Sequence, residues 1–280
     1  MTRFARAVEL APAQPPSPER AQALAALANG LMLAWRHDES LAVCEEALAI
    51  ARAVGERGAE VTARTVLGVD LAYLGRGDEG LAQLRLALQL AEDNGDQMAL
   101  ERAYVDLTDV LMMLGRLTES TRLAEAALEV LRPYGMDHST LVANRIEALL
   151  AMGEWDEADS LSRAAVRAIT ANYPHMSLLI RAVLELGRGD FGEARAHVEA
   201  ARATVHSDRD VAVYDGFVAE LALWERRWTD ADEAVRDGLA RVRSRETAQI
   251  RLRLCAHVPA APWPRRWRPP TGAGRPHGPG

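Results

Sequence analysis

Histidines could act as metal ligands or as acid-base catalysts, but their spacing in this sequence assembles neither kind of site. The seven histidines show none of the separations typical of metal ligands. Five of them fall at predicted turns, at helix ends or in the C-terminal tail, where a surface or capping role is expected. The seven are His37, His138, His175, His197, His206, His257 and His277.

The other reactive side chains are equally dispersed. Adjacent acids such as Asp156 and Glu157 are typical of a solvated helix face, whereas acid-base catalysis needs two carboxylates in one cleft with separated pKa values. A phosphate-binding Walker loop requires a lysine, and all 33 basic residues are arginine. The two cysteines, Cys44 and Cys255, supply neither a disulfide framework nor a zinc site. We therefore expect no enzyme, no cofactor and no metal.

Helices are the elements that must position any functional side chain in this sequence. Ala and Leu dominate, and only 5% of the residues are aromatic, which favours helices over strands. Between Pro18 and Pro259 the chain contains only Pro133 and Pro174. Because proline costs about 3 kcal/mol inside a helix, this long stretch is suited to uninterrupted helices.

A pattern of small and large residues repeats along these helices. Around Gly75 the order is Leu-Gly, an apolar residue three positions later, a turn glycine, and then small, large and small residues: Leu67, Gly68, Leu71, Gly75, Gly80, Leu84 and Ala87. Small residues in these slots let two antiparallel helices approach closely. The pattern predicts six turns, at Trp35, Gly75, Gly115, Gly153, near Gly189 and at Arg226. At the fifth turn the two helices fit Gly187 and Gly189 respectively, so we expect that turn to be two residues longer.

This pattern closely resembles the tetratricopeptide repeat. The resemblance implies an all-α fold, a right-handed α-solenoid of about six tetratricopeptide-like helix pairs. Residues 1–18 are interpreted as a Pro-rich lead-in and residues 19–244 as the repeat array. Residues 245–280 are interpreted as a partial helix followed by a disordered, basic tail rich in Pro, Gly and Arg.

The resemblance also implies where a partner would bind. In such repeats the first helix of each pair lines the concave surface, and its outward positions contact ligands. In this sequence those positions are Asn29, Met32, Tyr73, Arg102, Asp109, Met112, Met113, Glu147, Arg181, Glu185 and Trp224. Their mixture of Met, aromatic and charged residues suits a peptide or a small ligand. The alternative is that most of them are ordinary solvent-facing residues.

The amino-acid sequences of the repeats resemble those of one multidomain family. The runs TVLGVDLAYLGRGDEGLAQLRLALQLAEDNGD, YVDLTDVLMMLGRLTES and AELALWERRWTDADEAV resemble the helical region of large ATP-binding transcriptional regulators of the LuxR type. The likeness spans about residues 7–254, and it implies a region that senses an inducer or a protein partner. The family's ATPase and helix-turn-helix motifs are absent, so neither activity transfers. The sequence changes character after Leu254, which we interpret as a truncated or frameshifted array. The alternative is a free-standing tetratricopeptide adaptor protein.

Charge and hydropathy narrow the expected partners. After residue 244 there are seven Arg and one acid, Glu246, so this segment has a net charge of +6. Since the whole chain has a net charge of −7, residues 1–244 have a net charge of −13. So acidic an array is a poor non-specific binder of nucleic acid or anionic membrane. With no signal peptide or membrane span in view, we expect a cytoplasmic chain with a protein or peptide partner or a small inducer, and self-association through an uncapped C-terminal end.

Overall fold

The computed structural model describes residues 2–135, 138–167, 174–205 and 208–241, so the expected tail at 245–280 lies outside the described residues. The described chain is built from helices, with no strand in these ranges. Their bounds are α1 (Thr2–Leu10), α2 (Pro18–Leu33), α3 (His37–Val54), α4 (Arg57–Tyr73), α5 (Gly77–Asn94), α6 (Gln97–Met113), α7 (Leu117–Leu131), the 3-10 helix η1 (Arg132–Tyr134), α8 (Ser139–Met152), α9 (Trp155–Arg167), α10 (Pro174–Arg188), α11 (Phe191–Arg202), α12 (Asp208–Trp224) and α13 (Trp228–Arg241).

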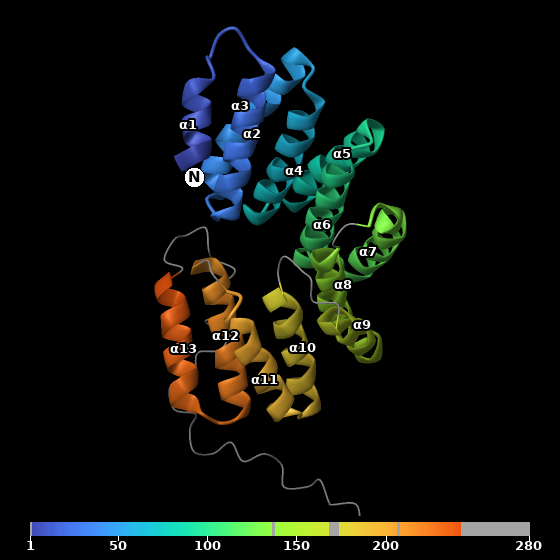
Figure 1. Cartoon of the computed structure of the whole chain (residues 1–280), viewed down its shortest axis with the longest axis vertical. Helices are drawn as coiled ribbons and strands as arrows, with labels where there is room; N and C mark the ends of the chain where they lie inside the picture. Colours follow the sequence, from blue (N-terminus) through green and yellow to red (C-terminus); the bar gives the residue numbers. More distant parts are fainter. Residues whose placement is uncertain (1, 136–137, 168–173, 206–207, 242–280) are drawn as a thin grey trace, which may run out of the picture.

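Helices α2 to α13 form six antiparallel pairs, which confirms the predicted all-α solenoid (Figure 1). The residue that separates the two helices of each pair has a left-handed backbone: Trp35, Gly75, Gly115, Gly153, Gly189 and Arg226. These are the six predicted turn positions. Three further left-handed glycines, Gly55, Gly95 and Gly135, follow α3, α5 and η1. Glycine suits these positions because it adopts positive φ without the strain that a Cβ introduces.

The fifth turn corrects one expectation. Gly189 alone makes the turn, with φ of 86°, and α10 continues through Gly187 to Arg188. The two extra residues therefore lengthen the helix and leave the turn short. Gly187 has a packing role, since a Cβ there would lie 2.2 Å from the Trp155 indole.

The first helices of the first three pairs begin with side-chain caps. At the start of α2 the Ser17 side chain accepts a hydrogen bond from the Arg20 backbone N–H. In the same way the Glu56 side chain accepts from the Ala59 N–H in α4, and the Asp96 side chain accepts from the Ala99 N–H in α6. Each cap satisfies one of the backbone donors left unpaired at a helix start.

Close packing within a pair is tightest between α4 and α5. A Cβ added to Gly80 would lie 2.4 Å from the Gly68 carbonyl oxygen, and one added to Gly68 would lie 2.8 Å from the Gly80 carbonyl oxygen. Leu81 and Leu84 are fully buried beside this contact. The small residues predicted for close approach therefore bring two backbones together.

The N-terminal segment contains a helix of its own. Helix α1 lies within residues 1–18 and contacts α2, where the Arg20 guanidinium donates to the carbonyl oxygens of Val8 and Ala11 at 3.4 and 2.9 Å. Phe4 packs over Gly30.

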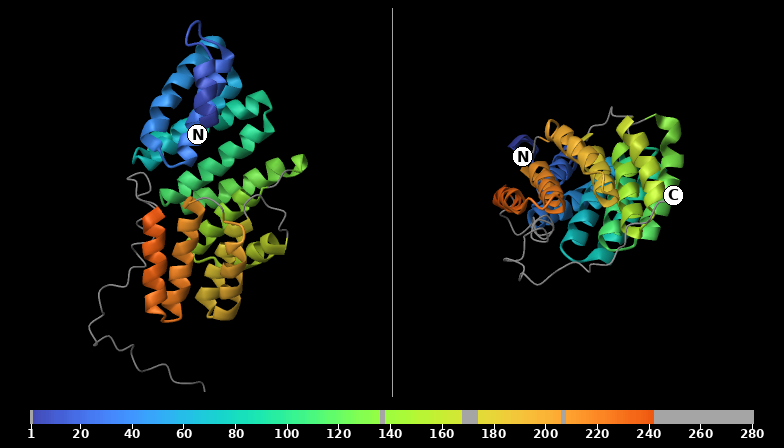
Figure 2. Two further views of the ribbon diagram at one scale, coloured as in Figure 1. Left: turned by 60° about the vertical axis from the view of Figure 1, so that its left-hand side comes forward. Right: turned by 90° about the horizontal axis from the view of Figure 1, so that it is seen from below.

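First helices contact both their own partners and the first helices of neighbouring pairs, so α2, α4, α6, α8, α10 and α12 form an inner layer. Helix α4 is buried on almost every side from Val61 to Ala72. The array curls until its two ends meet: Trp35, at the turn after α2, packs in one cluster with Ala212 of α12 and Val235 of α13. In Figures 1 and 2 the sixth pair accordingly lies directly below the first pair.

Candidate functional site

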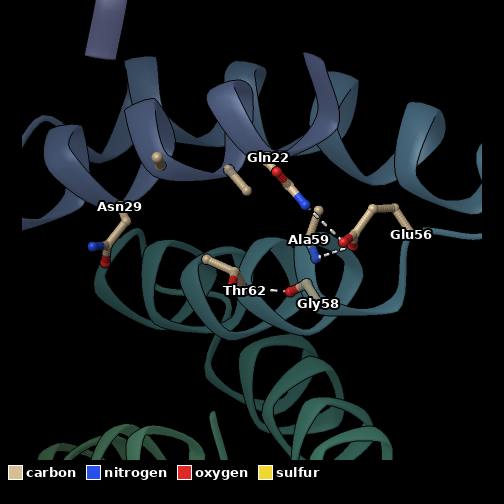
Figure 3. Close-up of a pocket in the computed structure, with 8 residues that line it drawn as sticks. Gln22, Asn29, Glu56, Gly58, Ala59 and Thr62 are labelled. Atoms are coloured by element: carbon tan, nitrogen blue, oxygen red, sulfur yellow. Dashed lines mark hydrogen bonds between the residues drawn. The ribbon is translucent and has the colours of Figure 1, made fainter. Parts of the chain in front are cut away.

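Two hollows lie between the first helices of the leading pairs. The larger one, which we call the Ala pocket, has a volume of about 280 Å³ and lies between α2 and α4 (Figure 3). Its floor is made of small residues and its rim of polar ones: Gln22, Ala25, Ala26, Asn29, Glu56, Gly58, Ala59 and Thr62.

Hydrogen bonds fix most of the Ala pocket's polar rim. One Glu56 carboxylate oxygen accepts from the Ala59 N–H at 2.7 Å, and the other accepts from Gln22 Nε2 at 2.9 Å. The Thr62 hydroxyl donates to the Gly58 carbonyl oxygen at 3.1 Å. The Glu56 carboxylate thus caps α4 and lines the hollow at once, and the floor of alanines leaves room for an apolar side chain.

The second hollow, which we call the aromatic pocket, is smaller, at about 90 Å³. It gathers residues from the end of α2, the following turn, the start of α3, α4 and α6: Met32, Leu33, Trp35, His37, Val69, Tyr73, Arg102, Asp106 and Asp109. The Tyr73 ring stacks on the His37 ring with centroids 4.9 Å apart, and the Trp35 ring meets both edge-on at 5.4 and 5.8 Å. Such edge and stacked geometries are the favoured ones for aromatic pairs.

A buried polar group lies behind the aromatic rings. His37 Nδ1 lies 2.8 Å from an Asp70 carboxylate oxygen, and the Cys44 thiol lies 4.0 Å from the other oxygen. Burial raises the pKa of Asp70, although hydrogen bonds from His37 and Ser40 act against the shift. Burial, together with the charge of Asp70, raises the pKa of Cys44 far above its ordinary value. Because the nucleophile would be the thiolate, this Cys-His-Asp grouping is not arranged for nucleophilic catalysis.

A hydrogen bond links residues that line the two pockets. The Arg102 guanidinium of α6 pairs with Asp106 one turn later and donates to the Asn29 side-chain oxygen at 3.1 Å. Asn29 lines the Ala pocket and Arg102 lines the aromatic pocket. The Tyr73 hydroxyl donates to Asp109 at 3.1 Å, which ties α4 to α6 along the same line. We call the two pockets and this bridge the inner groove.

The inner groove brings together five of the residues predicted from the sequence: Asn29, Met32, Tyr73, Arg102 and Asp109. Met112 and Met113 lie partly buried at the end of α6, where Met113 packs on the main core, and Glu147 lies half-buried on α8. None of these three lines either pocket. Trp224 is exposed at the end of α12, with its ring 6.5 Å from that of Phe191.

Arg181 and Glu185 correct the expectation of outward positions. Both are buried, at 6% and 4% exposure, and they pair with each other at 2.8 Å. The Arg181 guanidinium also contacts Asp159 of α9, and Glu185 accepts from His197 of α11 at 2.8 Å. Helical spacing placed them on the first helix correctly, but the charged partners on α9 and α11 draw them into the interior.

The groove residues that the sequence analysis missed include Trp35, His37 and Asp106 in the aromatic pocket. The sequence placed Trp35 at a turn without giving it any further role. His37 was expected at the surface, but its side chain is 4% exposed, and His175 is buried as well. The aromatic spacing of Trp35 and His37 was a usable signal, but the contact with Tyr73 depends on how α4 packs. Asp106 is four residues after Arg102, a separation that predicts their pairing.

Among the described residues, no group of three or more His, Cys, Asp or Glu side chains could hold a metal ion. Over the same ranges, none of the helices combines the length and the apolar character needed to cross a membrane.

Comparison with known proteins supports the fold and leaves the family open. No family model matches the sequence, and no curated protein matches it. The structure is similar to apo RapI (TM-score 0.64, 13% identity, 86% of this chain and 68% of that one). It is also similar to a tetratricopeptide repeat protein from Parabacteroides merdae (TM-score 0.60, 14% identity, 91% of this chain and 90% of that one). A third similar structure is TTC0263, a thermophilic tetratricopeptide protein from Thermus thermophilus (TM-score 0.55, 20% identity, 71% of this chain and 98% of that one).

These likenesses show a tetratricopeptide-like solenoid. They give no support to the resemblance to LuxR-type regulators.

Proposed function

We propose that this chain is a protein-interaction module that binds a peptide or an extended protein segment in the inner groove. The observation behind this proposal is that the two pockets are lined by the first helices of three pairs, and that Arg102, which lines the aromatic pocket, donates to Asn29, which lines the Ala pocket. An extended segment can place two of its side chains in two such pockets, each with apolar and polar walls.

The chemistry of the groove favours binding over catalysis. Its acids are engaged in capping or pairing: Glu56 caps α4, Asp106 pairs with Arg102, and Asp109 accepts from Tyr73. A small apolar hollow beside fixed polar groups is the usual form of a recognition site. The comparisons are compatible with a free-standing adaptor, and that is the context we propose in preference to a regulator of transcription.

Selection of random linear peptides on the full-length protein supplies a direct test. The selected peptides are synthesised, and their affinity is measured by fluorescence anisotropy for the wild type and for Ala26→Arg, which fills the Ala pocket from its floor. We expect Ala26→Arg to weaken binding at least about tenfold, or ~1.4 kcal/mol.

Ala49→Arg is the matched control, because Ala49 is exposed on the outer helix α3. It introduces the same side chain and charge away from the groove, so its affinity should equal that of the wild type. Circular dichroism checks that both variants fold. Equal binding by the two variants would place the peptide site elsewhere.

A further inference from the structure

We propose that two side-chain amides on α2, those of Gln22 and Asn29, bind the main chain of an extended segment that lies in the inner groove. This inference rests on the groove function proposed above and specifies how the partner is recognised. Both residues line the Ala pocket, and they lie well apart along α2 (Figure 3).

Asn29 supplies hydrogen-bond donors. Its side-chain oxygen accepts from the Arg102 guanidinium of α6 at 3.1 Å. A guanidinium group only donates hydrogen bonds, so the amide oxygen must face it, and the two N–H groups of Nδ2 are turned away from it. Among the described residues, Nδ2 has no hydrogen-bond partner. Because Asn29 lines the Ala pocket and Arg102 lines the aromatic pocket, a chain that crosses from one pocket to the other runs past these donors.

Gln22 supplies an acceptor. Its Nε2 donates to the Glu56 carboxylate at 2.9 Å. A carboxylate only accepts hydrogen bonds, so the NH2 group must face Glu56, and Oε1 is turned away from it. Within the part of the chain that the structure describes, Oε1 has no hydrogen-bond partner. Both amides are therefore oriented by contacts inside the protein, and each keeps one half for a partner.

A peptide main chain matches this pair of groups. Every residue other than proline carries one N–H donor, which suits the Gln22 oxygen, and one C=O acceptor, which suits the Asn29 NH2 group. Seven residues separate the two amides on α2, which places them on one face of the helix and roughly 10 Å apart along its axis. An extended peptide covers that distance in about three residues, and its alternate residues present N–H and C=O groups along the same edge.

The same chemistry excludes a helical partner. The main-chain groups of a helix are already paired with one another, so they cannot satisfy the two amides. The floor between the amides includes Ala25, Ala26 and Ala59, whose side chains have no polar atom, so the side chain that enters there is apolar. The expected partner is therefore an extended segment with one apolar residue over this floor, and its affinity depends on its main chain as much as on its side chains.

An ester scan of the peptides selected on the full-length protein tests this inference. Each main-chain amide in turn is replaced by an ester, which exchanges the N–H for an oxygen and leaves the side chains unchanged. We expect one ester position to weaken binding to the wild type about fivefold, as the loss of one hydrogen bond does. On Gln22→Met, which removes the acceptor, that ester should cost nothing further, whereas esters elsewhere should behave as on the wild type.

Asn29→Asp tests the other amide. The aspartate keeps an oxygen for Arg102 and removes the N–H donors, so binding should weaken at least about fivefold. Asn94→Asp is the matched control, because the Asn94 oxygen accepts from Arg57 at 3.3 Å on the outer helix α5 and lines neither pocket. It should bind as the wild type does, and circular dichroism checks the folding of all variants.

The outcomes separate this inference from the groove function. The main-chain contacts are wrong if no ester position weakens binding to the wild type, or if Gln22→Met and Asn29→Asp both bind as tightly as the wild type. If that happens while Ala26→Arg still blocks binding, the groove function stands and only the mode of recognition fails. If Ala26→Arg has no effect, the groove function fails and the main-chain contacts fail with it.

Discussion

The first three helix pairs and the last three are held together in different ways. Between α2 and α7 the turns recur every 40 residues, and Leu81, Leu84, Val110 and Leu111 share one apolar cluster. The His37–Asp70 pair and Arg64 are also buried in this half. Between α8 and α13 the turn spacing shortens, and charged groups enter the interior around Arg181.

This difference shows where regular repetition ends. Repeated small and large residues set most of the packing of the first half, where the buried charged groups are Asp70 beside His37 and Arg64 beside Glu60. The regular inner layer of this half forms the groove. The second half also depends on individual ion pairs, each of which satisfies a buried charge. Substitutions that act on one half and have a counterpart in the other can test this contrast.

The largest effect is expected from Arg181→Met. Removing the guanidinium leaves the buried Glu185 and the partly buried Asp159 with fewer partners, and such a loss costs about 3–5 kcal/mol. Urea unfolding should show the loss, and hydrogen exchange should locate it in α9, α10 and α11. Arg163→Met is the control, since Arg163 also pairs with Asp159 but is 54% exposed, and it should cost less than about 1 kcal/mol. Equal losses would contradict a buried network.

Gly80→Ala tests backbone packing in the first half. Its Cβ would lie 2.4 Å from the Gly68 carbonyl oxygen, which cannot move without shifting α4, so we expect a loss of about 2–3 kcal/mol. Gly187→Ala in the second half meets only the outer edge of the partly exposed Trp155 ring. That ring can turn aside, so thermal unfolding should detect less than about 1 kcal/mol. A greater loss at Gly187 would reverse the contrast.

Asp215 of α12 makes the second half sensitive to pH. Burial raises the pKa of its carboxyl to about 6, despite Arg241 nearby. The folded chain therefore holds this proton more tightly than the unfolded chain, whose pKa is about 4, and stability falls as pH rises from 4 to 6. Asp215→Asn should stabilise the protein by about 1–2 kcal/mol at pH 7.5 and have little effect at pH 4. A pH-independent gain in the melting temperature would contradict this origin.

The turns supply the smallest effect. Arg226 adopts φ of 60° where the corresponding turn in the second pair has Gly75 at φ of 88°. Arg226→Gly should stabilise by about 1 kcal/mol, and Gly75→Ala should destabilise by a similar amount. Arg226→Ala controls for loss of the arginine side chain and should leave the unfolding free energy nearly unchanged.

Much of this architecture could be predicted from local pattern. The six turns follow from spacing, because a helix pair needs one left-handed residue and small residues at the crossing. Arg145, on the first helix of the fourth pair, takes a position that is apolar in the repeat pattern. Its guanidinium reaches Glu157 at 2.6 Å and Glu125 at 3.4 Å.

The candidate site could be predicted only in part. Tyr73 and Arg102 follow from their positions on first helices. The pairing of Arg181 with Asp159, and the stacking of His37 under Tyr73, depend on contacts between helices that are distant in sequence. A one-dimensional pattern has no information on such partners.

The cluster around Trp35 changes how this array should lose its structure. In an open solenoid each end repeat has a single neighbour, so unfolding starts at the ends and spreads inward. Here Trp35 of the first pair packs with Ala212 and Val235 of the sixth, so each end shields the other. The unfolding of the first pair is then coupled to that of the sixth. A substitution that weakens the packing of one of these pairs should loosen the other before the pairs between them.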